Sequence, residues 1–106
     1  MSTEGWHDAG AADMIPEGEV IGCQLAGRGI ALARIGGECY AFDAWCTHGQ
    51  AALTDGFVEE DGSIECPLHQ GRFDIRSGKA LCEPLEKDLE TFALKIEDGR
   101  VWVRLG

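Results

Sequence analysis

Two short motifs, each with one cysteine and one histidine, constrain the fold of this chain more than any other feature of its sequence. The first motif is Cys46-Thr47-His48, and the second is Cys66-Pro67-Leu68-His69. Each offers one thiolate and one imidazole from a tight turn. Two such turns that face each other make a site with two sulfur and two nitrogen ligands. The fold must therefore bring two segments that are distant in the sequence to one place.

The ligand types narrow the choice of metal. Thiolate and imidazole ligands favour zinc, copper or iron–sulfur clusters over hard cations. The common Cys2His2 zinc finger keeps its cysteines together and its histidines together, whereas each motif here mixes the two types. In a Rieske-type [2Fe–2S] centre, one iron takes both cysteines and the other takes both histidines. The mixed motifs meet that need, and the pattern is also compatible with a single zinc ion.

Composition limits the class of protein and its compartment. The chain has 106 residues, 44% hydrophobic residues and a net charge of −10, so we expect one folded acidic domain and no nucleic-acid binding. The first ten residues do not resemble a signal peptide, and no segment approaches the ~20 apolar residues of a membrane span. We therefore expect a cytoplasmic protein without a membrane anchor. Five cysteines in a reducing compartment indicate metal binding, not a disulfide framework.

The pattern of strands and turns predicts an all-β fold. Fifteen glycines favour turns over long helices, and apolar runs recur at short spacing between turn residues. We predict strands over 19–25, 30–35, 38–44, 92–97 and 100–105, shorter strands over 63–65 and 72–75, turns at 27–29, 36–37 and 98–99, and one helical turn over 8–14. In this single domain, a basal β scaffold comprises about 1–44 and 85–106, and a loop-built, cluster-binding subdomain about 45–84.

The residues around both motifs resemble the Rieske family. The family pattern, C-x-H followed by C-x2-H, occurs here within CTHGQ (Cys46–Gln50) and CPLHQGRFD (Cys66–Asp74), and GKALCEP (Gly78–Pro84) is similar to the proline-bearing loop that covers the family's cluster. The resemblance extends over roughly Trp6 to Leu105. It implies an antiparallel β sandwich with an inserted cluster-binding subdomain, and one [2Fe–2S] cluster held by Cys46, His48, Cys66 and His69.

The resemblance also indicates which residues surround the cluster. It implies that five further positions lie next to it: Gly49, Gln50, Leu68, Gly71 and Pro84. The Rieske proteins of cytochrome bc complexes have a disulfide where this chain has Ala51 and Leu68. They also have Ser and Tyr hydroxyls, which bond to the cluster sulfurs, where this chain has Gly71 and Phe73. Because fewer hydrogen bonds stabilise the reduced cluster here, we predict a potential in the lower part of the family range, which begins at about −150 mV.

The function implied by this resemblance is electron transfer, not catalysis. Ferredoxins of bacterial aromatic ring-hydroxylating dioxygenase systems accept one electron from a flavoprotein ferredoxin reductase and pass it to a terminal oxygenase. We expect the same transient partners for this chain, no membrane or nucleic-acid partner, and a monomer. Two alternatives remain open: a small Rieske-like subunit of an assimilatory nitrite reductase, and a zinc-stabilised interaction module.

Overall fold

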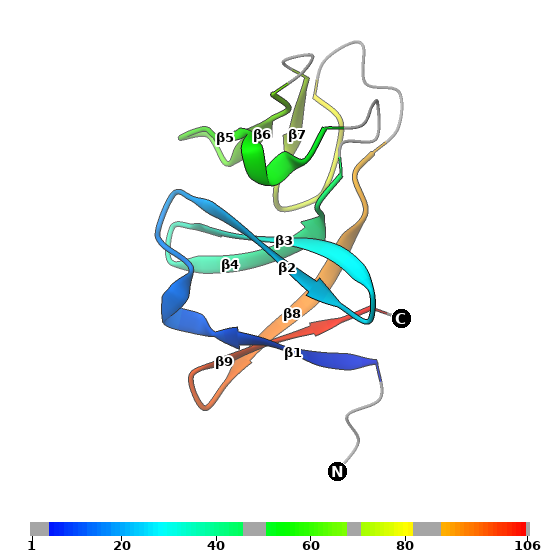
Figure 1. Cartoon of the computed structure of the whole chain (residues 1–106). Helices are drawn as coiled ribbons and strands as arrows, with labels where there is room; N and C mark the ends of the chain where they lie inside the picture. Colours follow the sequence, from blue (N-terminus) through cyan, green and yellow to red (C-terminus); the bar gives the residue numbers. More distant parts are fainter. Residues whose placement is uncertain (1–4, 46–50, 68–70, 82–87, 106) are drawn as a thin grey trace.

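The computed structural model describes residues 5–45, 51–67, 71–81 and 88–105 (Figure 1). Apart from two single 3-10 turns, all regular elements of these residues are β-strands, which confirms the predicted all-β fold. The elements are β1 (Trp6–Ala11), η1 (Ala12–Met14), β2 (Val20–Leu25), β3 (Arg28–Ile35), β4 (Glu38–Asp43), η2 (Leu53–Asp55), β5 (Phe57–Val58), β6 (Ser63–Glu65), β7 (Arg72–Asp74), β8 (Thr91–Glu97) and β9 (Arg100–Arg104). None of the helices in the described ranges has the length and apolar character needed to span a membrane.

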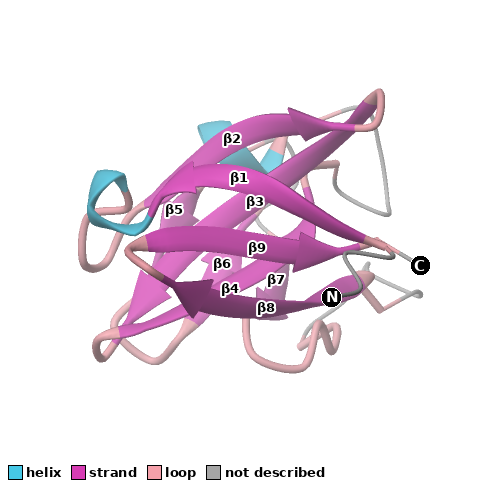
Figure 2. Cartoon of the chain, turned by 90° about the horizontal axis from the view of Figure 1, so that it is seen from below, coloured by secondary structure: helices cyan, strands magenta, loops and turns pink. Residues whose placement is uncertain are grey.

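Strands from both ends of the chain form an antiparallel sandwich. Six strands follow the order β1-β9-β8-β4-β3-β2, and β4 joins β8 through only two residue pairs, Ala41–Phe92 and Phe42–Thr91. At this narrow joint the sheet folds, so that β1, β9 and β8 lie across from β2, β3 and β4 (Figure 2). The two halves enclose a first core, whose buried members are Ala9, Ile15, Leu25, Ile30, Leu32, Ala41, Val101 and Val103.

Strand β3, which lies between β2 and β4, is buried on both faces. Successive side chains of a strand point to opposite faces, so a strand between two apolar layers needs an unbroken hydrophobic run. The run Ile30-Ala31-Leu32-Ala33 meets this need, and each of its residues is fully buried. Ile30 and Leu32 contribute to the first core, and Ala31 and Ala33 to a second core. The small alanines allow the layer on the second face to pack close to the strand.

That second layer is a small sheet from the middle of the chain. Strands β5, β6 and β7 pair in sequence order, and Ile64 of β6 lies opposite Phe73 of β7. Both side chains are fully buried in the second core, together with Phe42 of β4. The small sheet therefore rests on the outer face of the β3–β4 hairpin, beyond one end of the sandwich (Figure 1).

Two of the predicted turns connect hairpins as expected. At Gly36-Gly37 and Asp98-Gly99 both central residues have positive φ, the geometry of a two-residue hairpin loop. The Gly36-Gly37 turn has a second role. Its two N–H groups donate to the Glu17 carboxylate at 2.7 and 2.8 Å, which fixes the segment before β2 against the β3–β4 hairpin.

Two local predictions were wrong. The first turn lies at Ala26-Gly27, not at 27–29, because Leu25 pairs with Arg28 and Ala26 itself adopts a positive φ of 53°. The helical turn predicted over 8–14 is restricted to η1. Residues up to Ala11 form β1 instead, because they pair with β9. Strand β5 was not predicted, since two residues carry no periodic signal.

Gly78 allows two distant backbone segments to approach each other. Its φ is +78°, and its carbonyl accepts a hydrogen bond from the Leu89 N–H at 2.6 Å. A Cβ atom at this position would overlap the Leu89 carbonyl oxygen. Because Leu89 is buried in the second core, this approach fixes the return of the chain toward β8.

We predict that Gly78→Ala is more destabilising than Gly18→Ala. Gly18 has nearly the same φ, +76°, but a Cβ added there meets nothing within 4 Å. The substitution of Gly18 should therefore reduce the free energy of unfolding only by the cost of placing an alanine in the left-handed conformation, about 1–2 kcal/mol. Gly78→Ala adds an overlap with backbone, which we expect to cost a further ~1–3 kcal/mol. Denaturant unfolding of both variants measures the difference, and equal losses would contradict the role assigned to the Leu89 contact.

Candidate metal centre

One of the four predicted ligands lies among the described residues. Cys66 follows β6 directly, and its side chain is fully buried with a free thiol. Cys46, His48 and His69 lie outside the described residues, as do Gly49, Gln50, Leu68 and Pro84. Within the described ranges no three His, Cys, Asp or Glu side chains gather at metal-binding distance. The described residues show how the chain enters and leaves both motifs.

The ends of the second motif meet across the β6–β7 hairpin. The Cys66 N–H donates to the Gly71 carbonyl oxygen at 2.7 Å, one step beyond the pair formed by Glu65 and Arg72. This bond extends the ladder of the small sheet to the ligand position. Cys66 is thus fixed through its backbone by a strand, which limits how far its thiol can move.

The ends of the first motif are also held together. Trp45 and Ala52 form an antiparallel bridge, and the Leu53 N–H donates to the Ala44 carbonyl oxygen at 2.6 Å. Ala44 and Leu53 are buried in the second core. The chain therefore leaves β4 for the first motif and returns to η2 at the same place.

The segment that contains Pro84 begins and ends close to β7. The Leu81 N–H donates to the Arg72 carbonyl oxygen at 2.8 Å, so residues 80–81 run along β7. On the other side, the Asp88 side chain accepts a hydrogen bond from the Ala80 N–H at 3.0 Å. A carboxylate thus joins the two ends of the 82–87 segment.

All three pairs of ends converge on one buried layer. The second core includes residues next to each segment, namely Ala44 and Ala51, Cys66 and Phe73, and Leu89. These flanking residues come from separate parts of the sequence, and they pack in the core between the β5–β7 sheet and the β3–β4 hairpin, at one end of the molecule (Figure 1). Such convergence is what a site with ligands from two loops and a third covering loop requires.

The residues around Cys66 are apolar, which fits a cysteine that binds an iron–sulfur cluster through its sulfur. Gly71 is buried, and Phe73 is fully buried in the same core as Cys66. Neither residue has a hydroxyl that could bond to sulfur. Ala51 is also buried, and its side chain cannot form the disulfide of the bc-type proteins. The described residues around Cys66 therefore fit a buried thiolate with few hydrogen-bond donors from side chains.

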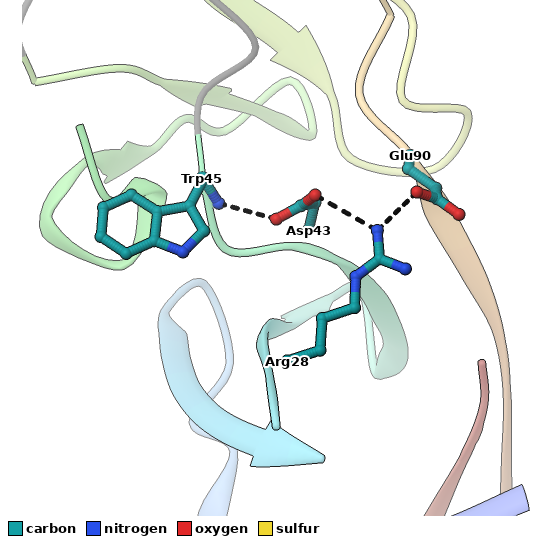
Figure 3. A network of polar contacts seen from close by, with 4 residues as sticks. All are labelled: Arg28, Asp43, Trp45 and Glu90. Atoms are coloured by element: carbon teal, nitrogen blue, oxygen red, sulfur yellow. Dashed lines mark hydrogen bonds and ion pairs between the residues drawn. The ribbon is translucent and has the colours of Figure 1, made fainter. Parts of the chain in front are cut away.

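A polar contact at Trp45, directly before the first motif in the sequence, was not predicted. The Trp45 N–H donates to Asp43 Oδ1 at 3.0 Å, and the other oxygen of Asp43 faces Arg28 (Figure 3). The Trp45 side chain is 53% exposed, so it does not pack in the core. A local signal was present, because an Asp side chain commonly accepts a hydrogen bond from the backbone N–H two residues later.

Comparison with known proteins agrees with this geometry. Residues 5–93 match the Rieske [2Fe-2S] domain family. The ferredoxin component of the naphthalene 1,2-dioxygenase/salicylate 5-hydroxylase systems of Ralstonia sp is 53% identical over 103 residues, which cover 97% of this chain and 98% of the relative. The ferredoxin component of the 2,4-dinitrotoluene dioxygenase system of Burkholderia sp. (strain RASC) is 50% identical over the same shares of the two chains.

Solved structures are similar over the same length. The Sphingomonas yanoikuyae B1 ferredoxin has a TM-score of 0.88 at 34% identity, covering 94% of this chain and 98% of that one. A chain in the complex of reduced oxygenase and oxidized ferredoxin of carbazole 1,9a-dioxygenase has a TM-score of 0.88 at 30% identity, with 95% and 94% covered. This chain therefore belongs to the Rieske [2Fe-2S] domain family and is a ferredoxin, an electron carrier with an iron–sulfur cluster.

Proposed function

We propose that this ferredoxin carries single electrons from a flavoprotein reductase to the terminal oxygenase of an aromatic ring-hydroxylating dioxygenase system. The main support is the 53% identity to a dioxygenase-system ferredoxin over almost the full length of both chains. A second support is that a complex of oxygenase and ferredoxin of carbazole 1,9a-dioxygenase contains a chain with this fold at 30% identity. The reductase is inferred from the need of such a system for an electron donor. The cytoplasmic location and the monomeric state stay predictions.

We also propose that Cys46, His48, Cys66 and His69 hold the cluster. Their support is the spacing of the two motifs, the burial of Cys66 and the convergence of the loop ends on one core. With two thiolate and two neutral imidazole ligands, an oxidised [2Fe–2S] core has no net charge, and it accepts an electron more readily than a core with four thiolates. Within the chain, the apolar layer around Cys66 keeps water from the thiolate side of the site.

Removal of the described ligand should abolish the cluster. We predict that Cys66→Ser loses it and becomes less stable, because metal binding is coupled to folding and a serine hydroxyl is a poor ligand for iron. Iron and acid-labile sulfide analysis of anaerobic protein, with EPR after reduction by dithionite, measures the loss. Cys23→Ser is the matched control, because Cys23 is a partly buried free thiol on β2, outside the motifs.

These measurements also test the ligand assignment and distinguish an iron–sulfur carrier from the zinc-stabilised alternative. A wild-type EPR spectrum in Cys66→Ser would contradict the ligand assignment. Zinc in place of iron in the purified wild-type protein would contradict the electron-carrier function itself.

Gly71 and Phe73, which both lack a hydroxyl, lead to a test of the potential. We predict that Gly71→Ser raises the midpoint potential relative to wild type, because a hydroxyl that bonds to a cluster sulfur stabilises the reduced state. Gly71→Ala is the control for the added Cβ at this buried position. Protein-film voltammetry measures both variants. If serine and alanine shift the potential equally, the missing hydroxyl does not explain a low potential.

The acidic composition leads to a test of docking. With a net charge of −10, we expect association with a basic partner surface to be accelerated by electrostatic attraction. The second-order rate of reduction by the reductase should therefore fall several-fold as ionic strength rises from about 0.1 M, where the Debye length is about 10 Å, to about 1 M, where it is about 3 Å. Stopped-flow absorbance measures this rate. A rate that does not depend on salt would rule out electrostatic docking.

A further inference from the structure

Three charged residues at the ends of β3, β4 and β8 meet next to Trp45 (Figure 3). Arg28 is the first residue of β3, Asp43 is the last of β4, and Glu90 directly precedes β8. Arg28 Nη2 donates to Glu90 Oε1 at 2.5 Å and lies 3.4 Å from Asp43 Oδ2. We call these three residues the Arg28 network. It joins the strand that leads into the first motif to the strand that follows the 82–87 segment.

The Arg28 guanidinium is held in place by more than its two carboxylates. It lies over the Phe92 ring, with 4.8 Å between Cζ and the ring centroid. The bond to Glu90 is the main reason that the pKa of Arg28 is raised above its usual value, so the group stays charged. In addition, the Asp43 N–H donates to the Glu90 carbonyl oxygen at 2.9 Å. Backbone and side-chain contacts therefore fix Asp43 relative to β8.

Stability alone does not explain this arrangement. The three side chains are 27–57% exposed, and exposed ion pairs contribute little to the free energy of unfolding. The position of these three residues in the fold indicates a role better than their contribution to stability does. The network lies where β4 and β8 share only two residue pairs, which is the narrow joint of the sandwich. It also uses both oxygens of Asp43, one toward Arg28 and one toward the Trp45 N–H.

We propose that Asp43 is a positioning residue for the first ligand loop and that Arg28 and Glu90 hold it in the required orientation. Asp43 Oδ1 fixes the Trp45 peptide, and Trp45 directly precedes Cys46 in the sequence. The network thereby fixes the last described residue before Cys46 and His48. This inference rests on the proposed ligand set. It assigns to surface charges a role in holding the cluster in one geometry.

The chain contains a matched control for this role. Asp8 on β1 accepts a hydrogen bond through Oδ1 from the N–H two residues later, that of Gly10, at 2.9 Å. It also pairs with an arginine, Arg100 of β9, at 3.1 Å. Asp8 therefore repeats the local contacts of Asp43 on the β1–β9 pair, whose strands do not directly precede either motif in the sequence; its side chain is 40% exposed, against 27% for Asp43.

The experiment compares Asp43→Ala, Asp43→Asn and Asp8→Ala as anaerobic holoproteins. We expect Asp43→Ala to show a broadened or two-component EPR spectrum after reduction, and to lose its cluster to excess chelator several-fold faster than wild type. Asp43→Asn keeps an oxygen acceptor for the Trp45 N–H, so it should lie closer to wild type. Asp8→Ala should match wild type in both readouts at a temperature where circular dichroism shows all variants folded.

A variant of the supporting residue keeps the test decisive if Asp43→Ala does not fold. Arg28→Gln leaves the Asp43–Trp45 hydrogen bond possible but removes its anchor, so it should accelerate cluster loss to a smaller extent. Where both single variants fold, the double variant should lose its cluster no faster than Asp43→Ala, because both changes act through one contact.

Two results would overturn the inference while leaving the proposed function intact. One is that Asp43→Ala, or Arg28→Gln if the former does not fold, matches Asp8→Ala in spectrum and rate. The other is an additive effect of the two changes on the logarithm of the rate. Failure of the function itself would be seen separately, as a wild-type protein without iron and sulfide.

Discussion

The contact between the outer face of β3–β4 and the small sheet is the interaction on which the rest of this structure depends. Ala31, Ala33 and Phe42 present an apolar surface to Ile64 and Phe73, and every one of these side chains is fully buried. Burial of apolar surface is the main stabilising term for such a layer. A three-stranded sheet of two- and three-residue strands has little stability of its own, so this contact makes the cluster region possible.

Most of the scaffold could be predicted because its signals are local. Alternating apolar residues beside Asp98-Gly99 and Gly36-Gly37 indicate hairpins, since only a few residue types adopt positive φ at both turn positions. The position of β1 could not be predicted in this way. Its residues form a strand because they pair with β9, which lies about ninety positions later in the chain, and pairing across that distance leaves no local pattern.

The candidate site likewise has one part that could be predicted from local sequence and one part that could not. The spacing of the two motifs is sufficient to propose the ligands, because each Cys–His pair lies within a few residues. What supports Cys66 could not be predicted, since its bond to Gly71 depends on the register of β6 and β7. The contact between Arg28 and Glu90 could not be predicted either. They are 62 positions apart and meet only after β3, β4 and β8 assemble.

The fixation of the loop ends has a consequence for electron transfer. A carrier that gains and loses one electron works best when its ligands keep their positions in both states, which requires support by the residues around them. Here Asp43 holds Trp45, which precedes residues 46–50, the Cys66–Gly71 bond joins the residues that flank 68–70, and Asp88 binds Ala80 across residues 82–87. Two of these anchors are carboxylates that accept backbone N–H groups at the ends of the segments. Part of the acidic composition therefore serves to hold the described ends of these segments, in addition to contributing to the net charge of −10.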